Sequence, residues 1–169
     1  MTTIRVLGLD LSLGQTGIAL PDGELATIRP HRTDTGYARH WTVADAVAGH
    51  VHTSAPDVVL IEGYLLFGKR PNIAGLEIGG IVRAILHRRG VPFVDVPPST
   101  LKVFAVNDGR ATKEQMFDAA RALCAQDPPR NDDEADAFWL RRMGVARYLL
   151  GTDHRAFQKI TWPEIGVPT

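Results

Sequence analysis

The chain has 169 residues, 44% of them hydrophobic, which is enough to bury a core but short for two substantial domains. Its 19 basic and 19 acidic residues balance, so local patches and not net charge would have to meet a polyanionic partner. A single cysteine, Cys124, excludes an intrachain disulfide and a cysteine-based zinc site, and we expect it to be a small core residue in a reducing compartment. No apolar run approaches the roughly 20 residues of a membrane span, so we expect a soluble, cytoplasmic protein without a membrane partner.

Apolar runs and helical periodicities alternate along the chain and predict an α/β fold. In chain order, the predicted elements are strands at 4–11, 16–20 and 24–29, a helix at 37–51, a strand at 57–62, a helix at 72–89, a strand at 91–96, and helices at 99–106, 112–125 and 132–150. Three early strands joined by hairpins, followed by alternating helices and strands, imply a five-stranded mixed sheet with helices on both faces. Periodicity is lost after residue 150, so we expect one domain over 1–150 and a peripheral tail over 151–169.

Two acidic residues stand at the ends of predicted central strands. Asp10 ends the first apolar run and Glu62 ends the fourth, at the edge where α/β sheets usually form their sites. An ionised side chain in a buried strand is unfavourable unless it binds a cation or a partner. Capping of a turn is the alternative, and it explains one such acid better than two on neighbouring strands.

A third acidic group opens the last predicted helix, at 131–136. Acids in a first helical turn complement the helix dipole, and Asn131 or Asp132 is a natural cap. Asp133 and Asp136, however, are three positions apart and project from one face, and Asp136 lies too far inside the helix to be only a cap. The residues around them, Ala135 and Ala137, are small enough to permit close packing on a sheet.

Four converging carboxylates without cysteine or histidine suit hard cations such as magnesium or manganese. Two such ions about 4 Å apart can activate a water and stabilise a leaving oxygen in phosphodiester hydrolysis. These residues alone therefore predict phosphoryl transfer to water.

The acids lie within ordered motifs at 7–17, 61–62 and 133–137: an aspartate on strand one followed by a glycine-containing turn and a Thr-Gly pair, a glutamate-bearing strand, and a helix with two aspartates three apart. This set resembles the RuvC-type Holliday-junction resolvases of the ribonuclease H-like superfamily. The resemblance implies two Mg²⁺ or Mn²⁺ ions per site, held by Asp10, Glu62, Asp133 and Asp136. The choice of Asp133 over Asp132 rests on motif alignment alone.

The resemblance extends to 99–104 and 109–116. It implies that Lys102 and Lys113 lie beside the metal site and the scissile phosphate, where an ammonium would offset the charge that develops in the transition state. Lysines at helix starts are ordinarily solvated, so these two roles depend on the motif context. The implied enzyme is a crossover junction endodeoxyribonuclease that makes paired symmetric nicks in branched DNA, in recombination and repair or in the processing of phage DNA.

Contacts to DNA are expected beyond the metal site. The block 63–70 follows the glutamate where the family carries an aromatic that stacks on bases, and stacking contributes about 1 to 3 kcal/mol per base. Tyr64 or Phe67 could fill that role, and burial in the core is an equal alternative. The residues expected to contact phosphates are Lys69, Arg70, Lys102, Arg110 and Lys113.

The predicted helix at 72–89 contains Gly75, Gly79 and Gly80, although glycine costs about 1 kcal/mol in a helix interior. Close packing explains such glycines, either against the sheet or against a second subunit. The resemblance implies a twofold interface in this region, and a four-way junction offers two symmetric strands to cut. We therefore expect a homodimer.

Other functions compete with this prediction. The turn after Asp10 is also similar to the phosphate-binding turn of the actin and sugar-kinase ATPases, but those proteins need a second lobe and a longer chain. A non-catalytic junction-binding protein of the same fold is a second alternative, against which all four acids argue. Nucleases of related fold cut RNA–DNA hybrids or precursor ribosomal RNA, and transposases share the carboxylate geometry; the two lysines and the late Asp-x-x-Asp favour the resolvase.

Overall fold

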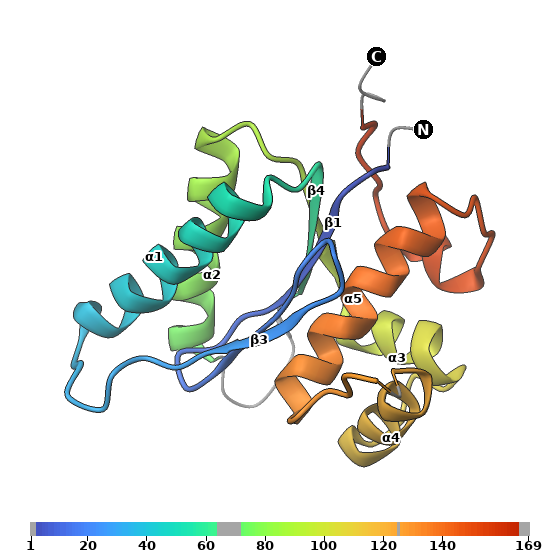
Figure 1. Cartoon of the computed structure of the whole chain (residues 1–169), viewed down its shortest axis with the longest axis horizontal. Coiled ribbons are helices and arrows are strands. Elements are labelled where there is room, and N and C mark those ends of the chain that lie inside the picture. The colour runs from blue at the N-terminus through green and yellow to red at the C-terminus, as the bar shows by residue number, and fades with distance from the viewer. Residues whose placement is uncertain (1–2, 64–71, 125, 166–169) are drawn as a thin grey trace.

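The computed structural model describes residues 3–63, 72–124 and 126–165, and it contains a five-stranded mixed sheet (Figure 1). The strands are β1 (Val6–Asp10), β2 (Thr16–Ala19), β3 (Leu25–Ile28), β4 (Val58–Glu62) and β5 (Phe93–Val96). Their order is β3-β2-β1-β4-β5, with antiparallel pairs β1/β2 and β2/β3 and parallel pairs β1/β4 and β4/β5. The mixed sheet expected from the early hairpins is confirmed.

Helices cover both faces of the sheet, as expected. They are α1 (Tyr37–Ser54), α2 (Ile73–Arg88), α3 (Pro98–Val106), α4 (Lys113–Leu123) and α5 (Asp132–Tyr148), followed by the 3₁₀ helix η1 (Arg155–Lys159). In Figure 1, α1 and α2 lie on one side of the sheet and α3, α4 and α5 on the other. None of the helices in the described ranges is long and apolar enough to cross a membrane.

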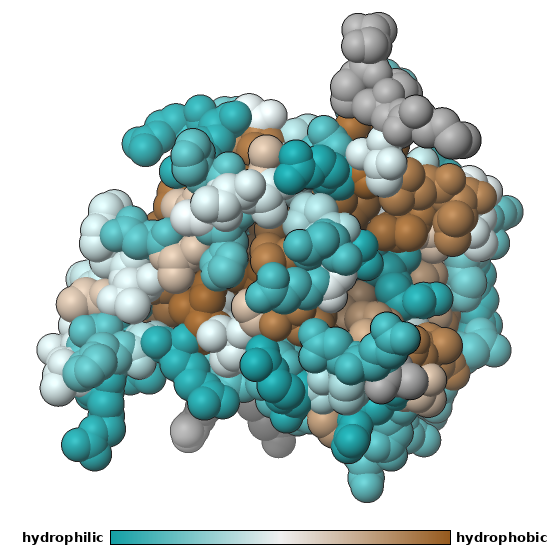
Figure 2. Space-filling model, viewed as in Figure 1, coloured by the Kyte–Doolittle hydropathy of each residue, from teal (hydrophilic) through white to brown (hydrophobic). Residues whose placement is uncertain are grey.

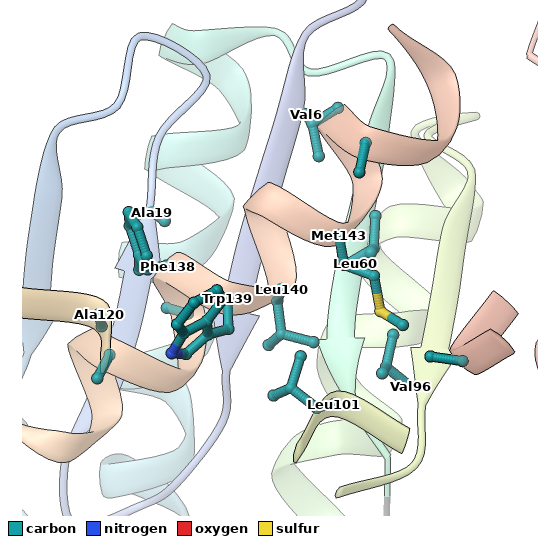
Figure 3. Packing of buried hydrophobic residues seen from close by; sticks show 14 of the residues in the cluster. Val6, Ala19, Leu60, Val96, Leu101, Ala120, Phe138, Trp139, Leu140 and Met143 are labelled. Atoms are coloured by element: carbon teal, nitrogen blue, oxygen red, sulfur yellow. The ribbon is translucent and has the colours of Figure 1, made fainter. Parts of the chain in front are cut away.

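Two hydrophobic layers follow from the alternation of side chains along the strands. Leu7 and Leu9 point into the layer under α1 and α2, whereas Val6 and Leu60 point into the layer under α5. Figure 3 shows this second layer, in which Leu140 of α5 lies among residues of the sheet and of α3. Because side chains alternate along β1, its even-numbered residues lie on the face that α5 covers. Asp10 is therefore on the α5 face of the sheet.

Helix α5 packs on β1 and β2 at backbone distance. A Cβ added to Gly8 would lie 2.1 Å from the carbonyl oxygen of Ala137, and one added to Gly17 would lie 2.0 Å from that of Asp133. No side chain fits at either position, so the two glycines set the depth of α5 on the sheet. The close packing expected from the small residues of this helix is present, and glycines of the strands permit it.

Burial differs from expectation at Cys124, and several large apolar side chains are exposed. Tyr37 and Trp41 of α1 are 72% and 61% exposed, because the helix turns only its Val43, Ala44 and Val47 side toward the sheet. Cys124 is only partly buried, since it caps the C-terminal end of α4 and its thiol donates to the carbonyl oxygen of Asp127. Figure 2 shows hydrophobic side chains gathered at the end of α5, where Leu149 and Leu150 are also exposed.

Candidate metal centre and active site

Asp10, Glu62 and Asp136 come together at one edge of the sheet. The parallel register pairs Leu9 with Ile61, so the next residues of β1 and β4 are the two acids, both on the face that α5 covers. Asp136 reaches the same point from the second turn of α5. One carboxylate oxygen from each of the three residues lies within 4.8 Å of the others.

The pKa values of all three acids are raised, in each case mainly by burial. Burial raises the pKa of Asp10 well above its usual range, and the charges of Glu62 and Asp136 raise it further. Burial likewise raises the pKa of Glu62, and burial together with Glu62 raises the pKa of Asp136 to about 7. Negative charge is therefore concentrated in a small, poorly hydrated space. A bound divalent cation would offset the repulsion between the carboxylates.

Oxygen ligands at this spacing suit a hard cation. Magnesium and manganese prefer carboxylate oxygens, and the described residues around the cluster include no cysteine or histidine among its ligand groups. The acids lie in an open cavity of about 370 Å³, which leaves room for a phosphate beside the ion. The cavity is lined by Asp10, Leu11, Ser12, Glu62, Pro98, Leu101, Lys102, Lys113, Met116, Asp133 and Asp136. The residues present thus fit the metal site that the sequence predicts.

Both lysines singled out in the sequence border this cavity. The positive charges of Lys113 and Lys102 lower the pKa of Glu62 against the effect of burial, which places both ammonium groups within electrostatic range of the acids. Lys113 also lies 4.0 Å from Asp132, and its side chain is 71% exposed. Both cations are therefore available to a ligand that enters the cavity.

Asp133 lines the cavity, but it is not one of the three clustered acids. Its carboxylate is instead hydrogen-bonded to Gln15. Gln15 Nε2 donates a 2.6 Å hydrogen bond to Asp133 Oδ2, and Arg29 Nε donates to Gln15 Oε1 at 2.7 Å. Asp132, the alternative to Asp133, does not line the cavity and faces Lys113 instead. Sequence reasoning missed Gln15 and Arg29 as supports, because no periodicity links a turn residue with a helix 118 positions away.

Glu134, between the two predicted ligands, has a structural task. Its side chain is fully buried and accepts hydrogen bonds from Thr27 at 2.5 Å and from Arg130 Nη2 at 2.7 Å. Burial alone would raise the pKa of Glu134, but the hydrogen bonds from Arg130 and Thr27 outweigh it and hold the pKa below its usual value. Arg130 also donates to the carbonyl oxygen of Leu25, so this group ties the start of α5 to β3.

Arg110 is the one remaining predicted DNA contact among the described residues. Arg110 is exposed on the loop before α4, where its backbone N–H donates to Asp108, and it does not line the cavity. Tyr64, Phe67, Lys69 and Arg70 lie outside the described residues.

The fold and the acidic centre define a ribonuclease H-like protein of the resolvase type. No family model matches the chain. Curated relatives do: RuvC crossover junction endodeoxyribonuclease from Frankia casuarinae is 31% identical over 149 residues, covering 81% of this chain and 86% of the relative, and that from Synechococcus sp. strain CC9902 is 29% identical over 143 residues, covering 79% and 93%. The chain belongs to the RuvC family of crossover junction endodeoxyribonucleases.

Solved structures agree on the fold. RuvC of Thermus thermophilus superposes with a TM-score of 0.68 at 21% identity, covering 88% of this chain and 98% of that one. The same enzyme in complex with a Holliday junction substrate gives 0.71 at 20% identity, with coverage of 89% and 98%. The yeast mitochondrial Holliday junction resolvase Ydc2 gives 0.51 at 15% identity, covering 88% and 82%. The expected fold class is confirmed by these neighbours.

Proposed function

We propose that the chain is a metal-dependent endonuclease that resolves Holliday junctions and related branched DNA. The observation that carries the proposal is the convergence of Asp10, Glu62 and Asp136 in one cavity with Lys102 and Lys113, in a chain of the RuvC family. Carboxylates for cations and ammonium groups for phosphates are the two requirements of phosphodiester hydrolysis.

In this proposal the three acids and Asp133 would hold two Mg²⁺ or Mn²⁺ ions, which when bound supply activation of a water molecule and stabilisation of the leaving oxygen. Lys102 and Lys113 bind the non-bridging oxygens of the scissile phosphate and offset the negative charge that develops there. Gln15 keeps the carboxylate of Asp133 turned to the cavity, and Glu134 keeps the first turn of α5 against the sheet. The protein thus supplies a rigid set of charges around a phosphate.

Further contacts would position the branched substrate. Arg110 is exposed on the loop before α4, the helix that begins with Lys113, and it can contact a backbone phosphate. Lys69 and Arg70 are proposed to contact phosphates as well. Tyr64 or Phe67 would stack on a base at the crossover. The role of Tyr64 or Phe67 follows from the family resemblance, and that of Lys69 and Arg70 from their place in the chain after the proposed site.

We also propose a homodimer, which would present two sites to the two symmetric strands of a junction. A Cβ added to Gly80, on the exposed side of α2, meets no atom within 4 Å, so packing against the sheet does not account for this glycine. Gly75 instead accommodates the Asn72 side chain that caps the helix. Ile73 at the start of α2 and Trp41 on the adjacent α1 are 64% and 61% exposed, which supports a partner on this side.

The test is cleavage of a labelled four-way junction, a replication fork, a linear duplex and an RNA–DNA hybrid, each with magnesium, manganese or chelator. We expect metal-dependent paired nicks across the junction, abolished in Asp10→Asn and Glu62→Gln while junction binding persists. Preferential cleavage of the hybrid would replace the substrate but keep the metal site. Junction binding without cleavage by the wild-type protein would favour a non-catalytic binding protein.

A further inference from the structure

A second cavity, of about 380 Å³, adjoins the first turns of α3. Whereas Pro98, Leu101 and Lys102 face the acidic cavity, the alternate residues Ser99, Thr100 and Val103 line this one. The described residues that line it are Ser99, Thr100, Val103, Gly109, Arg155, Ala156, Gln158 and Lys159. One short helix therefore separates the two cavities.

The C-terminal segment forms the outer wall of this cavity. Ala156 and Phe157 of η1 are buried, and the ring of Phe157 stacks on Phe104 of α3 with centroids 5.8 Å apart. Arg155 Nη2 donates a 2.8 Å hydrogen bond to the carbonyl oxygen of Asn107. These contacts anchor η1 on α3 and leave Lys159 exposed at the cavity.

The lining has the chemistry of an anion site. The described lining residues include the two cations Arg155 and Lys159 and no acidic residue. Thr100 lines this cavity and is 3% exposed, and its hydroxyl makes no hydrogen bond to another described residue. A hydroxyl that lines a cavity beside two cations lacks only an acceptor, and phosphate oxygens are acceptors.

We propose that this cavity binds a backbone phosphate of the DNA strand whose scissile phosphate lies at the carboxylates, so that the C-terminal segment is part of the DNA-binding surface. The inference rests on the proposed function. Because adjacent turns of α3 line both cavities and the helix backbone is only about 5 Å across, a strand can reach the second cavity within a few nucleotides of the first.

The experiment measures binding of a fluorescent four-way junction by anisotropy in chelator, over a series of salt concentrations, for the wild type and four variants. We expect Lys159→Ala to weaken binding several-fold and to reduce the salt slope by about 1, with Lys159→Arg restoring both. Thr100→Val, which removes the hydroxyl but keeps the shape, should also weaken binding. Arg5→Ala is the control, since Arg5 precedes the opposite end of β1. Melting temperatures verify that each variant is folded.

The possible results separate the two proposals. Wild-type affinity and salt slope in folded Lys159→Ala and Thr100→Val would overturn the second site while leaving junction binding in place. A wild-type protein that binds no junction would overturn the proposed function as well. If inorganic phosphate alone raises the melting temperature through Lys159 while junction binding ignores the substitution, the site takes free phosphate and the inference is wrong.

Discussion

Gly17 of β2 lies directly beneath the first turn of α5, where a Cβ would stand 2.0 Å from the carbonyl oxygen of Asp133. This contact brings the helix that carries Asp136 down onto β2 at Gly17, which pairs with Asp10 of the neighbouring β1. The acidic centre therefore depends on the absence of a side chain two strands away from Glu62. Gly8 makes the same kind of contact one turn further along the helix.

We predict that Gly17→Ala displaces α5 and loses cleavage. Overpacking costs about 1 to 3 kcal/mol, which corresponds to a drop of several degrees in melting temperature for a domain of this size. Calorimetry and cleavage assays on the variant measure both effects. Gly49→Ala is the matched control: Gly49 lies on the exposed side of α1 with open space around it, and alanine should stabilise the helix. Normal activity in folded Gly17→Ala would contradict the prediction.

Asp136→Asn should inactivate the enzyme and yet stabilise it in chelator. Because the pKa of Asp136 is raised from 3.8 to about 7, the native state binds a proton that the unfolded state releases, and the metal-free protein loses stability as pH rises from about 4 to 7. Asparagine removes this loss of stability. The gain in stability of Asp136→Asn over the wild type should therefore be absent near pH 4 and complete above pH 7. Melting curves at pH 5 and pH 8 measure this gain. Asp45→Asn, on the exposed side of α1, is the control.

The effect of metal on the same variant runs in the opposite direction. Magnesium should raise the melting temperature of the wild type at pH 8 because it binds the native state, and it should do so much less for Asp136→Asn. An equal rise in both proteins would show that Asp136 is not a ligand.

Glu134→Gln should destabilise the fold by about 1 to 3 kcal/mol, since the buried charge-assisted hydrogen bonds from Arg130 and Thr27 are weakened. The pKa of Glu134 lies below that of an unfolded glutamate, so its stabilising contribution is present above pH 4.5 and declines as pH falls further. Urea unfolding at pH 7 measures the difference, and Glu114→Gln, on the exposed side of α4, provides the comparison.

For Gln15→Ala we expect a loss of about 10-fold in cleavage at limiting magnesium, a size typical when a residue that orients a metal ligand is removed. Saturating magnesium should recover part of the rate, and chelated protein should bind the junction as the wild type does. The measurement is a magnesium titration of cleavage. An unchanged titration would mean that the hydrogen bond to Asp133 does not position a ligand.

Gly80→Glu should convert the proposed dimer to monomer. The space around Gly80 is empty within the subunit, and in the proposed dimer the partner subunit would occupy it. Gly49→Glu places the same side chain at another open helical glycine and should leave the mass unchanged. Sedimentation at several concentrations measures the mass of each. A wild type that is monomeric at every concentration, or a Gly80→Glu variant that remains dimeric, would contradict the interface.

The sequence alone determined the elements and the two strand-end acids. Apolar periodicity reports local backbone geometry, so the boundaries of β4 and α2 agree with the prediction to within one residue. Side-chain alternation likewise places Asp10 and Glu62 on one face once their strands are neighbours. The position of Asp136 inside a helix, beyond the reach of a capping role, was visible in the same way.

Tertiary structure decided which acids meet and what holds them. Asp133, Glu134 and Asp136 share one helix, yet one is held by Gln15, one is tied to β3 and one joins the carboxylate cluster. Periodicity cannot separate them, because hydrogen bonds across more than 100 residues depend on how the elements pack. The docking of η1 on Phe104 is of the same kind: it arises from ring packing between distant segments, in a region where the sequence has no regular pattern.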